Sequence, residues 1–119
     1  MIILSIPVKT VSESNDHSHW TSKHKRHRIQ KQAIWSAFKE GNVQVSTPCH
    51  IKLTRLAPGT LDSDNLSSAL KFVRDTVASQ IIPGLAPGRA DDDKLITWDY
   101  SQEKNKEYAI RIEIYDVPF

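Results

Sequence analysis

Acidic side chains gather at two places in the second half of this 119-residue chain. Asp62 and Asp64 stand two residues apart where a helical pattern begins, and Asp91, Asp92 and Asp93 follow in a later loop. Carboxylate oxygens suit Mg²⁺, which keeps coordination positions open for water and for a phosphate oxygen. An ion held between the two groups would polarise phosphorus and lower the pKa of a bound water. The spacing therefore predicts a metal-dependent hydrolytic centre.

A local interpretation of the first pair is also open. Asp64 precedes Asn65 and Leu66, which is the place of an N-cap carboxylate that accepts a first-turn N–H. Asp62 is then a solvated neighbour. The metal interpretation instead places both acids on an extended approach to the helix, aimed at one point, with a third oxygen ligand from the run of three aspartates.

The basic residues lie mainly in the first half of the chain. Residues 1–59 carry nine Lys or Arg and three acids, a balance of +6, whereas residues 60–119 carry seven and eleven, a balance of −4. Between Asp16 and Glu40 there is no acid. The candidate phosphate contacts in that stretch are Lys23, Lys25, Arg26, Arg28, Lys31 and Lys39. A basic surface beside clustered carboxylates is typical of a metal-dependent enzyme that acts on nucleic acid.

Other interpretations of the basic stretch remain. It is a solvated charged loop in the simplest one. The four histidines between residues 17 and 27 form a zinc site in another, although neither a Cys nor a Glu at helical spacing accompanies them. Trp20 and Trp35 are expected to be core anchors rather than platforms for base stacking.

The first half of the chain predicts two strands and one helix. Alternating apolar residues indicate a strand over 2–6, and residues 9–28 lack apolar periodicity and are expected to form a loop or arm. Apolar residues recur at helical spacing over 29–40, where Gly41 follows as a stop. Residues 50–56 alternate as a half-buried strand does.

The most regular segment is a helix over 64–81. Its apolar stripe consists of Leu66, Leu70, Val73, Val77 and Ile81. The opposite side forms a polar rail of Asp64, Ser68, Lys71 and Asp75. Residues 95–100 and 108–115 are predicted to be strands joined as a hairpin, the second with alternating buried isoleucines.

Together these elements predict a single domain over residues 1–119, of the α+β class, with a small mixed sheet and two main helices. Apolar residues make up 39% of the chain and charged residues 25%, which is a globular composition. The lone Cys49 excludes a disulfide framework within one chain and fits a reducing, cytoplasmic compartment. The apolar opening is too short to span a bilayer and lacks the features of a secretory signal, so no membrane partner is expected.

Several of these residues resemble the RusA family of Holliday-junction resolvases. The matching residues are Asp62-Ser63-Asp64-Asn65-Leu66, then Ala69, Lys71, Arg74 and Asp75, then Asp91-Asp92-Asp93 and Leu95-Ile96-Thr97-Trp98. The resemblance covers nearly the whole chain. It implies a small α+β homodimer that binds four-way DNA junctions and nicks strands of like polarity, with Mg²⁺ or Mn²⁺ as the cofactor.

The resemblance also implies which acids hold the metal. Asp62 and Asp64 match the family's ligands, and one acid of the later run joins them. Alignment on Trp98 favours Asp92 as that ligand, whereas a one-residue insertion favours Asp91.

One position departs from the family pattern. Ser68 stands where the best-known members carry a catalytic lysine, and Lys71 is expected to take that role at the scissile phosphate. If it does not, Lys71 is an exposed lysine paired with Asp75 at i+4. Arg55 and Arg74 are further candidate DNA contacts. The rival functions are a branched-DNA-binding module that lost catalysis, and a nuclease that acts on flaps or other branched DNA.

Overall fold

The computed structural model describes residues 1–15, 20–83 and 94–116. The elements in chain order are β1 (Ile2–Ile6), the 3₁₀ turn η1 (Glu13–Asn15), α1 (Trp20–Glu40), β2 (Cys49–Ala57), α2 (Ser63–Ile81), β3 (Ile96–Lys104) and β4 (Ala109–Asp116). The fold is α+β with a four-stranded mixed sheet and two main helices, as the sequence predicts. None of the described helices contains a stretch apolar and long enough to cross a bilayer.

The sheet has the strand order β1-β4-β2-β3. Strand β3 runs parallel to β2, whereas β4 is antiparallel to both β1 and β2. The predicted hairpin of the last two strands is therefore wrong. The chain leaves β3, passes the end of β2 where the Asn105 amide donates to the Ala57 carbonyl, and enters the centre of the sheet. A central place suits β4 because its three isoleucines are buried on one face.

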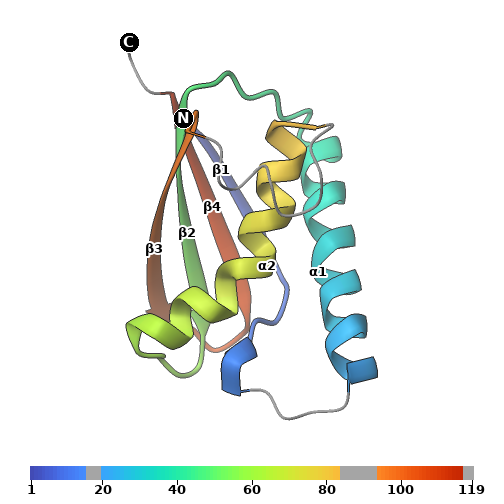
Figure 1. Ribbon diagram of the computed structural model, residues 1–119, viewed down its shortest axis with the longest axis vertical. Coiled ribbons are helices and arrows are strands. Elements are labelled where there is room, and N and C mark those ends of the chain that lie inside the picture. The colour runs from blue at the N-terminus through green and yellow to red at the C-terminus, as the bar shows by residue number, and fades with distance from the viewer. Residues whose placement is uncertain (16–19, 84–93, 117–119) are drawn as a thin grey trace.

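Both helices cover the same face of the sheet (Figure 1). The core between them and the sheet is fully buried around Ile51 and Leu53 of β2, Ile112 of β4, and Leu70 and Val73 of α2. Each such side chain contributes about 1.5–3 kcal/mol when it is removed from water. The predicted apolar stripe of the 64–81 helix is confirmed, because its members pack in this core or against it.

Helix α1 is longer than its apolar pattern predicts. It begins at Trp20, so the prediction that residues 9–28 form a loop is wrong from Trp20 onward. Lys and Arg favour helix almost as well as Leu does, and no Gly or Pro interrupts this stretch. Only Gln30, Ile34 and Phe38 of α1 are buried, so the first half of the helix has no apolar stripe for periodicity to detect.

Candidate functional site

The start of α2 is held by Asp62. Its backbone is extended, and its carboxylate accepts from the Asn65 amide N–H at 2.8 Å and from Asn65 Nδ2 at 3.1 Å. Asp62 is therefore the N-cap, and the prediction that Asp64 caps the helix is wrong by two residues. Asp64 lies inside the first turn rather than on an extended approach. Asn65 is the third residue after Asp62, the spacing that a capping side chain reaches.

Hydrogen bonds at this end favour the ionised form of Asp62. The hydrogen bond from the Asn65 backbone, followed by the one from its side chain, holds the pKa of Asp62 below its ordinary value. Asp64 is exposed in the first turn, where the helix dipole favours negative charge. Mg²⁺ is commonly bound by one or two carboxylates together with waters and substrate phosphates, so this pair fits part of such a site.

The predicted third ligand cannot be placed, because Asp91, Asp92 and Asp93 lie outside the described residues. Within residues 1–15, 20–83 and 94–116, no three His, Cys, Asp or Glu side chains group closely enough to hold a metal. The proposed zinc ligands His17 and His19 also fall outside this part of the chain.

The N-terminal end of β3 lies far from the Asp62 end of α2. Leu61 is hydrogen-bonded to the Gln102 side chain, at 2.9 Å and 2.6 Å, whereas Leu95 accepts from the Cys49 amide at the other end of the sheet. Strand β3 rises about 3.3 Å per residue, so the six steps from Gln102 to Ile96 span about 20 Å. The residue that follows the aspartate run, Lys94, is therefore at the opposite end of the sheet from Asp62.

The polar rail of α2 is partly covered by the segment that precedes α1. The Ser14 amide donates to Ser68 Oγ at 2.8 Å, and the Ser12 hydroxyl donates to Asn65 Oδ1. Ser68, where the RusA resemblance expects a lysine, is thus engaged with this segment. Lys71 is exposed one turn further along α2, and its proposed role stays a prediction.

Two arginines predicted to bind DNA have protein partners. Arg55 is only 5% exposed, and its guanidinium donates to Thr10 Oγ1 at 3.1 Å and to the Gly59 carbonyl at 3.0 Å. It therefore does not lie on a surface that a DNA backbone would contact. Burial lowers the pKa of Arg55, although an arginine remains charged. The alternation of β2 could have indicated this, because Arg55 shares the face of the buried Leu53.

Arg74 is half-buried beside β3. Its Nη1 donates to the Tyr100 hydroxyl at 2.9 Å, and its guanidinium carbon lies 4.9 Å from the centre of the Trp98 ring. Arg74 thus joins α2 to β3 through a hydrogen bond and a cation–π contact.

The cations of α1 divide into two groups. Arg26 forms a two-point ion pair with Glu13, with Nη2 2.6 Å from Oε2, and Lys23 Nζ lies 4.0 Å from the same carboxylate. His27 also contacts Glu13, at 3.0 Å, and stacks on Phe72 with 4.0 Å between ring centres. These contacts attach the first half of α1 to η1 and α2.

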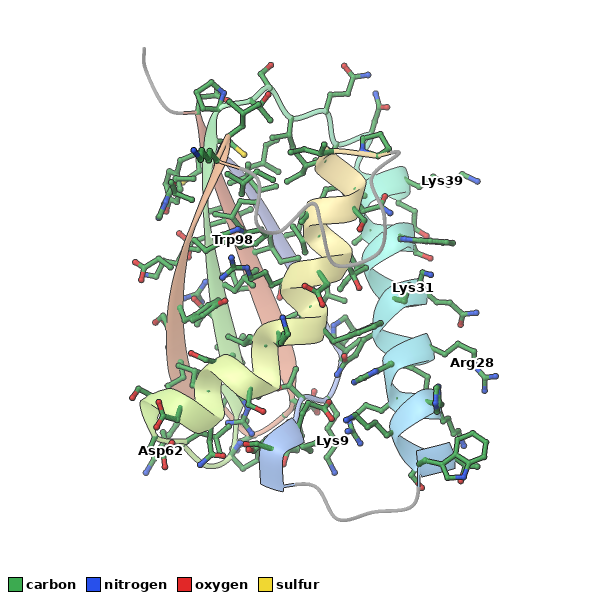
Figure 2. All side chains as sticks on the ribbon, in the orientation of Figure 1. Lys9, Arg28, Lys31, Lys39, Asp62 and Trp98 are labelled. Carbon is green, nitrogen blue, oxygen red and sulfur yellow. The ribbon has the colours of Figure 1, made fainter. Side chains whose placement is uncertain are left out.

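The other cations of α1 are exposed. We call them the cationic face, which consists of Lys25, Arg28, Lys31 and Lys39. Figure 2 shows Arg28 and Lys39 projecting from the side of α1 that is turned away from the sheet.

Three exposed residues near these groups were not predicted as part of a surface site. Trp20 and Trp35 are 65% and 48% exposed, so the prediction that they are core anchors is wrong. The inner side of α1 is already occupied by Ile34 and Phe38, and Trp35 follows Ile34 by about 100° around the helix. Lys9 is exposed with Nζ 5.2 Å from the Tyr108 ring, and in Figure 2 it lies between Asp62 and α1.

Neither a scan of protein-family models nor a search of curated proteins found a match to this chain. The surface has two features that bear on function: the pair of exposed carboxylates that begins α2, and the cationic face of the neighbouring helix.

Proposed function

We propose that this protein is a divalent-metal-dependent endonuclease that resolves four-way DNA junctions, as its RusA resemblance implies. The observation that carries the proposal is the pairing of two groups beside one sheet face. Helix α2 begins with two exposed carboxylates, while α1 exposes the cationic face and has no acid before its last residue, Glu40. Cations in a row neutralise successive phosphates, and recognition of this kind responds to DNA shape rather than to base sequence.

The residues present fit a bound Mg²⁺ or Mn²⁺ in part. Asp62 and Asp64 would hold the ion, which when bound supplies a Lewis acid for phosphorus and a more acidic water. Asn65 orients the Asp62 carboxylate and lowers its pKa through two hydrogen bonds. Lys71 would contact the scissile phosphate, and the cationic face would hold the flanking backbone in position.

The proposal includes a homodimer, because paired nicking of one junction needs two active sites related by symmetry. The third acid that the resemblance implies, from the Asp91–Asp93 run, would complete the ligand set of each site.

The deciding experiment compares wild type with Asp64→Asn on a synthetic four-way junction in Mg²⁺. The amide retains the shape of the carboxylate but binds a hard cation poorly, so nicking should fall at least about 100-fold. Junction affinity, measured in Ca²⁺ or EDTA, should change less than about twofold, because Asp64 contacts no phosphate in the proposal. Asp99→Asn, an exposed acid on β3, is the matched control and should nick normally. Undiminished nicking by Asp64→Asn would contradict the proposal.

A branched-DNA-binding module without catalysis is the second candidate. It is favoured by one observation, namely that Ser68 replaces the family's lysine and its hydroxyl accepts from Ser14. Tight junction binding with no nicking in either Mg²⁺ or Mn²⁺ would establish it. Cleavage rates on a flap, a junction and a linear duplex, compared side by side, would identify a flap nuclease.

A further inference from the structure

An open hollow lies beside the last turns of α1, about 320 Å³ in volume. Its lining includes Trp35, Phe38 and Lys39 of α1, Asn42 and Gln44 of the following loop, and Gln80 near the end of α2. The loop turns sharply here because Asn42 adopts a left-handed backbone, with φ of 47°, which Asn tolerates well. The hollow thus combines an indole, an ammonium group and three side-chain amides.

The indole at this hollow is not needed by the core. Trp35 is 48% exposed, whereas Ile34 beside it is fully buried. Lys31 Nζ lies 4.8 Å from the centre of the Trp35 ring, so a positive charge accompanies the exposed aromatic surface. Trp35 therefore offers aromatic surface and an adjacent positive charge to a partner.

The chemistry of the hollow matches an unpaired base better than it matches a duplex. An aromatic ring with nearby cations stacks bases of any sequence and contacts the adjoining phosphates. Asn and Gln amides each offer donors and an acceptor, which is what the hydrogen-bonding edge of a base requires. The Watson–Crick edge and the face of a base are accessible together only when the base is unpaired.

We infer that this hollow binds an unpaired nucleobase of a DNA strand, with Trp35 as the stacking platform. The amides of Asn42, Gln44 and Gln80 would meet the base edge, and Lys31 and Lys39 would meet flanking phosphates. That the strand is DNA rests on the proposed function. The site itself is separate from the carboxylates, since 18 residues of α2 between Asp62 and Gln80 span about 27 Å.

The test measures fluorescence anisotropy of a labelled 20-nucleotide single strand and of the matched duplex, with the full-length protein at constant salt. Trp35→Ala should weaken single-strand binding at least about fivefold, since removal of a stacking aromatic costs about 5–150-fold. Duplex affinity should stay within about twofold. Trp35→Phe keeps an aromatic ring and should restore most of the affinity.

The matched control is Ile29→Ala, because Ile29 is 49% exposed on α1 but does not line the hollow. It should bind both probes as wild type does. Thermal unfolding of all variants, followed by far-UV circular dichroism, shows whether a loss of binding reflects a loss of folding. If Trp35→Ala does not fold, single-strand binding by Trp35→Phe is compared with that of wild type instead.

The inference is overturned if Trp35→Ala binds the single strand normally, or if it weakens both probes equally. It is also overturned if wild type prefers anionic phosphatidylserine vesicles over the single strand and Trp35→Ala abolishes that preference. These outcomes are independent of nicking. If the protein nicks junctions but Trp35→Ala does not change single-strand binding, only the base-binding site is contradicted. If Trp35→Ala weakens single-strand binding selectively but the protein never nicks, only the proposed catalysis is contradicted.

Discussion

The two helices lie on the same sheet face but are held there in different ways. Helix α2 has 19 residues and buries seven of them, whereas α1 has 21 residues and buries three. Helix α2 packs directly on β2 and β3, and α1 lies against α2 and β1. The difference shows that α2 is positioned by the core, while most of the surface of α1 is available to a partner.

Polar contacts replace apolar packing along the first half of α1. Glu13 receives Arg26 and His27, and the Gln30 side chain donates to the Lys9 carbonyl at 2.7 Å. All of these partners lie in the segment between β1 and α1. This segment therefore determines where the cationic face begins.

The largest expected effect is a difference in the stability lost when a core residue of each helix is truncated. Leu70→Ala in α2 removes a fully buried side chain between helix and sheet and should lower the free energy of unfolding by about 3–5 kcal/mol. Ile34→Ala in α1 should cost about 2–3 kcal/mol, because a helix with few buried neighbours relaxes into the space more readily. Urea unfolding followed by circular dichroism measures both. Equal losses would mean that α1 is embedded as firmly as α2.

A smaller effect is expected at the polar attachment of α1. Glu13→Gln removes the negative charge that Arg26 and His27 contact. It should lower the free energy of unfolding by about 1.5–3 kcal/mol, the contribution of hydrogen bonds to charged groups. Hydrogen exchange should speed up over residues 20–28 more than over α2. The control is Glu107→Gln, because Glu107 is an exposed acid in the loop before β4. It should leave the free energy of unfolding and the hydrogen exchange of α1 unchanged. Uniform exchange along α1 would show that Glu13 does not anchor it.

The cationic face should affect DNA affinity and not stability. Arg28→Gln should reduce the slope of log affinity against log salt by about 1, as each lost phosphate contact does, and Lys25→Gln should do the same. Stability should stay within about 0.5 kcal/mol of wild type, as for most surface substitutions. Lys106→Gln, an exposed lysine between β3 and β4, should keep the wild-type slope. A slope lowered equally by Lys106→Gln would point to net charge alone.

The smallest effect is the acid sensitivity of the α2 N-cap. The pKa of Asp62 is lowered in the folded protein from its ordinary value of 3.8, because the ionised form accepts from Asn65. Its stabilisation is therefore present above pH 3.8 and is lost as the pH falls through the lowered pKa. Asp62→Asn should flatten the dependence of Tm on pH in that acidic range and leave it unchanged near neutrality. An unaltered acid profile would show that the cap does not contribute.

Much of the fold could be predicted from local patterns. Strands β1 and β2 and helix α2 lie within a residue or two of their predicted bounds, because alternation and the 3.6-residue period are properties of neighbouring residues. The first turns of α1 could not be predicted this way, since Glu13 and Phe72 hold them from outside the helix. The prediction of a hairpin was wrong because β4 pairs with β1 and β2, which are distant in the chain.

The candidate site divides in the same manner. The sequence identifies Asp62 and Asp64 at a helix start, and the structure decides which of them caps it. A single charge count treats Arg55 and Arg28 alike, but β2 buries the first and α1 exposes the second. The hollow beside Trp35 had no sequence signal, because its lining comes from two helices and a loop.

By itself the amino-acid sequence determined the α+β class, the apolar stripe of α2 and the acid-free run of cations in α1, since each depends only on residue type and spacing. Tertiary packing alone decided that β4 enters the centre of the sheet and that Trp35 stays in water while Ile34 is buried. The physical reason is that burial depends on which surfaces meet, and residues distant in the chain supply the second surface.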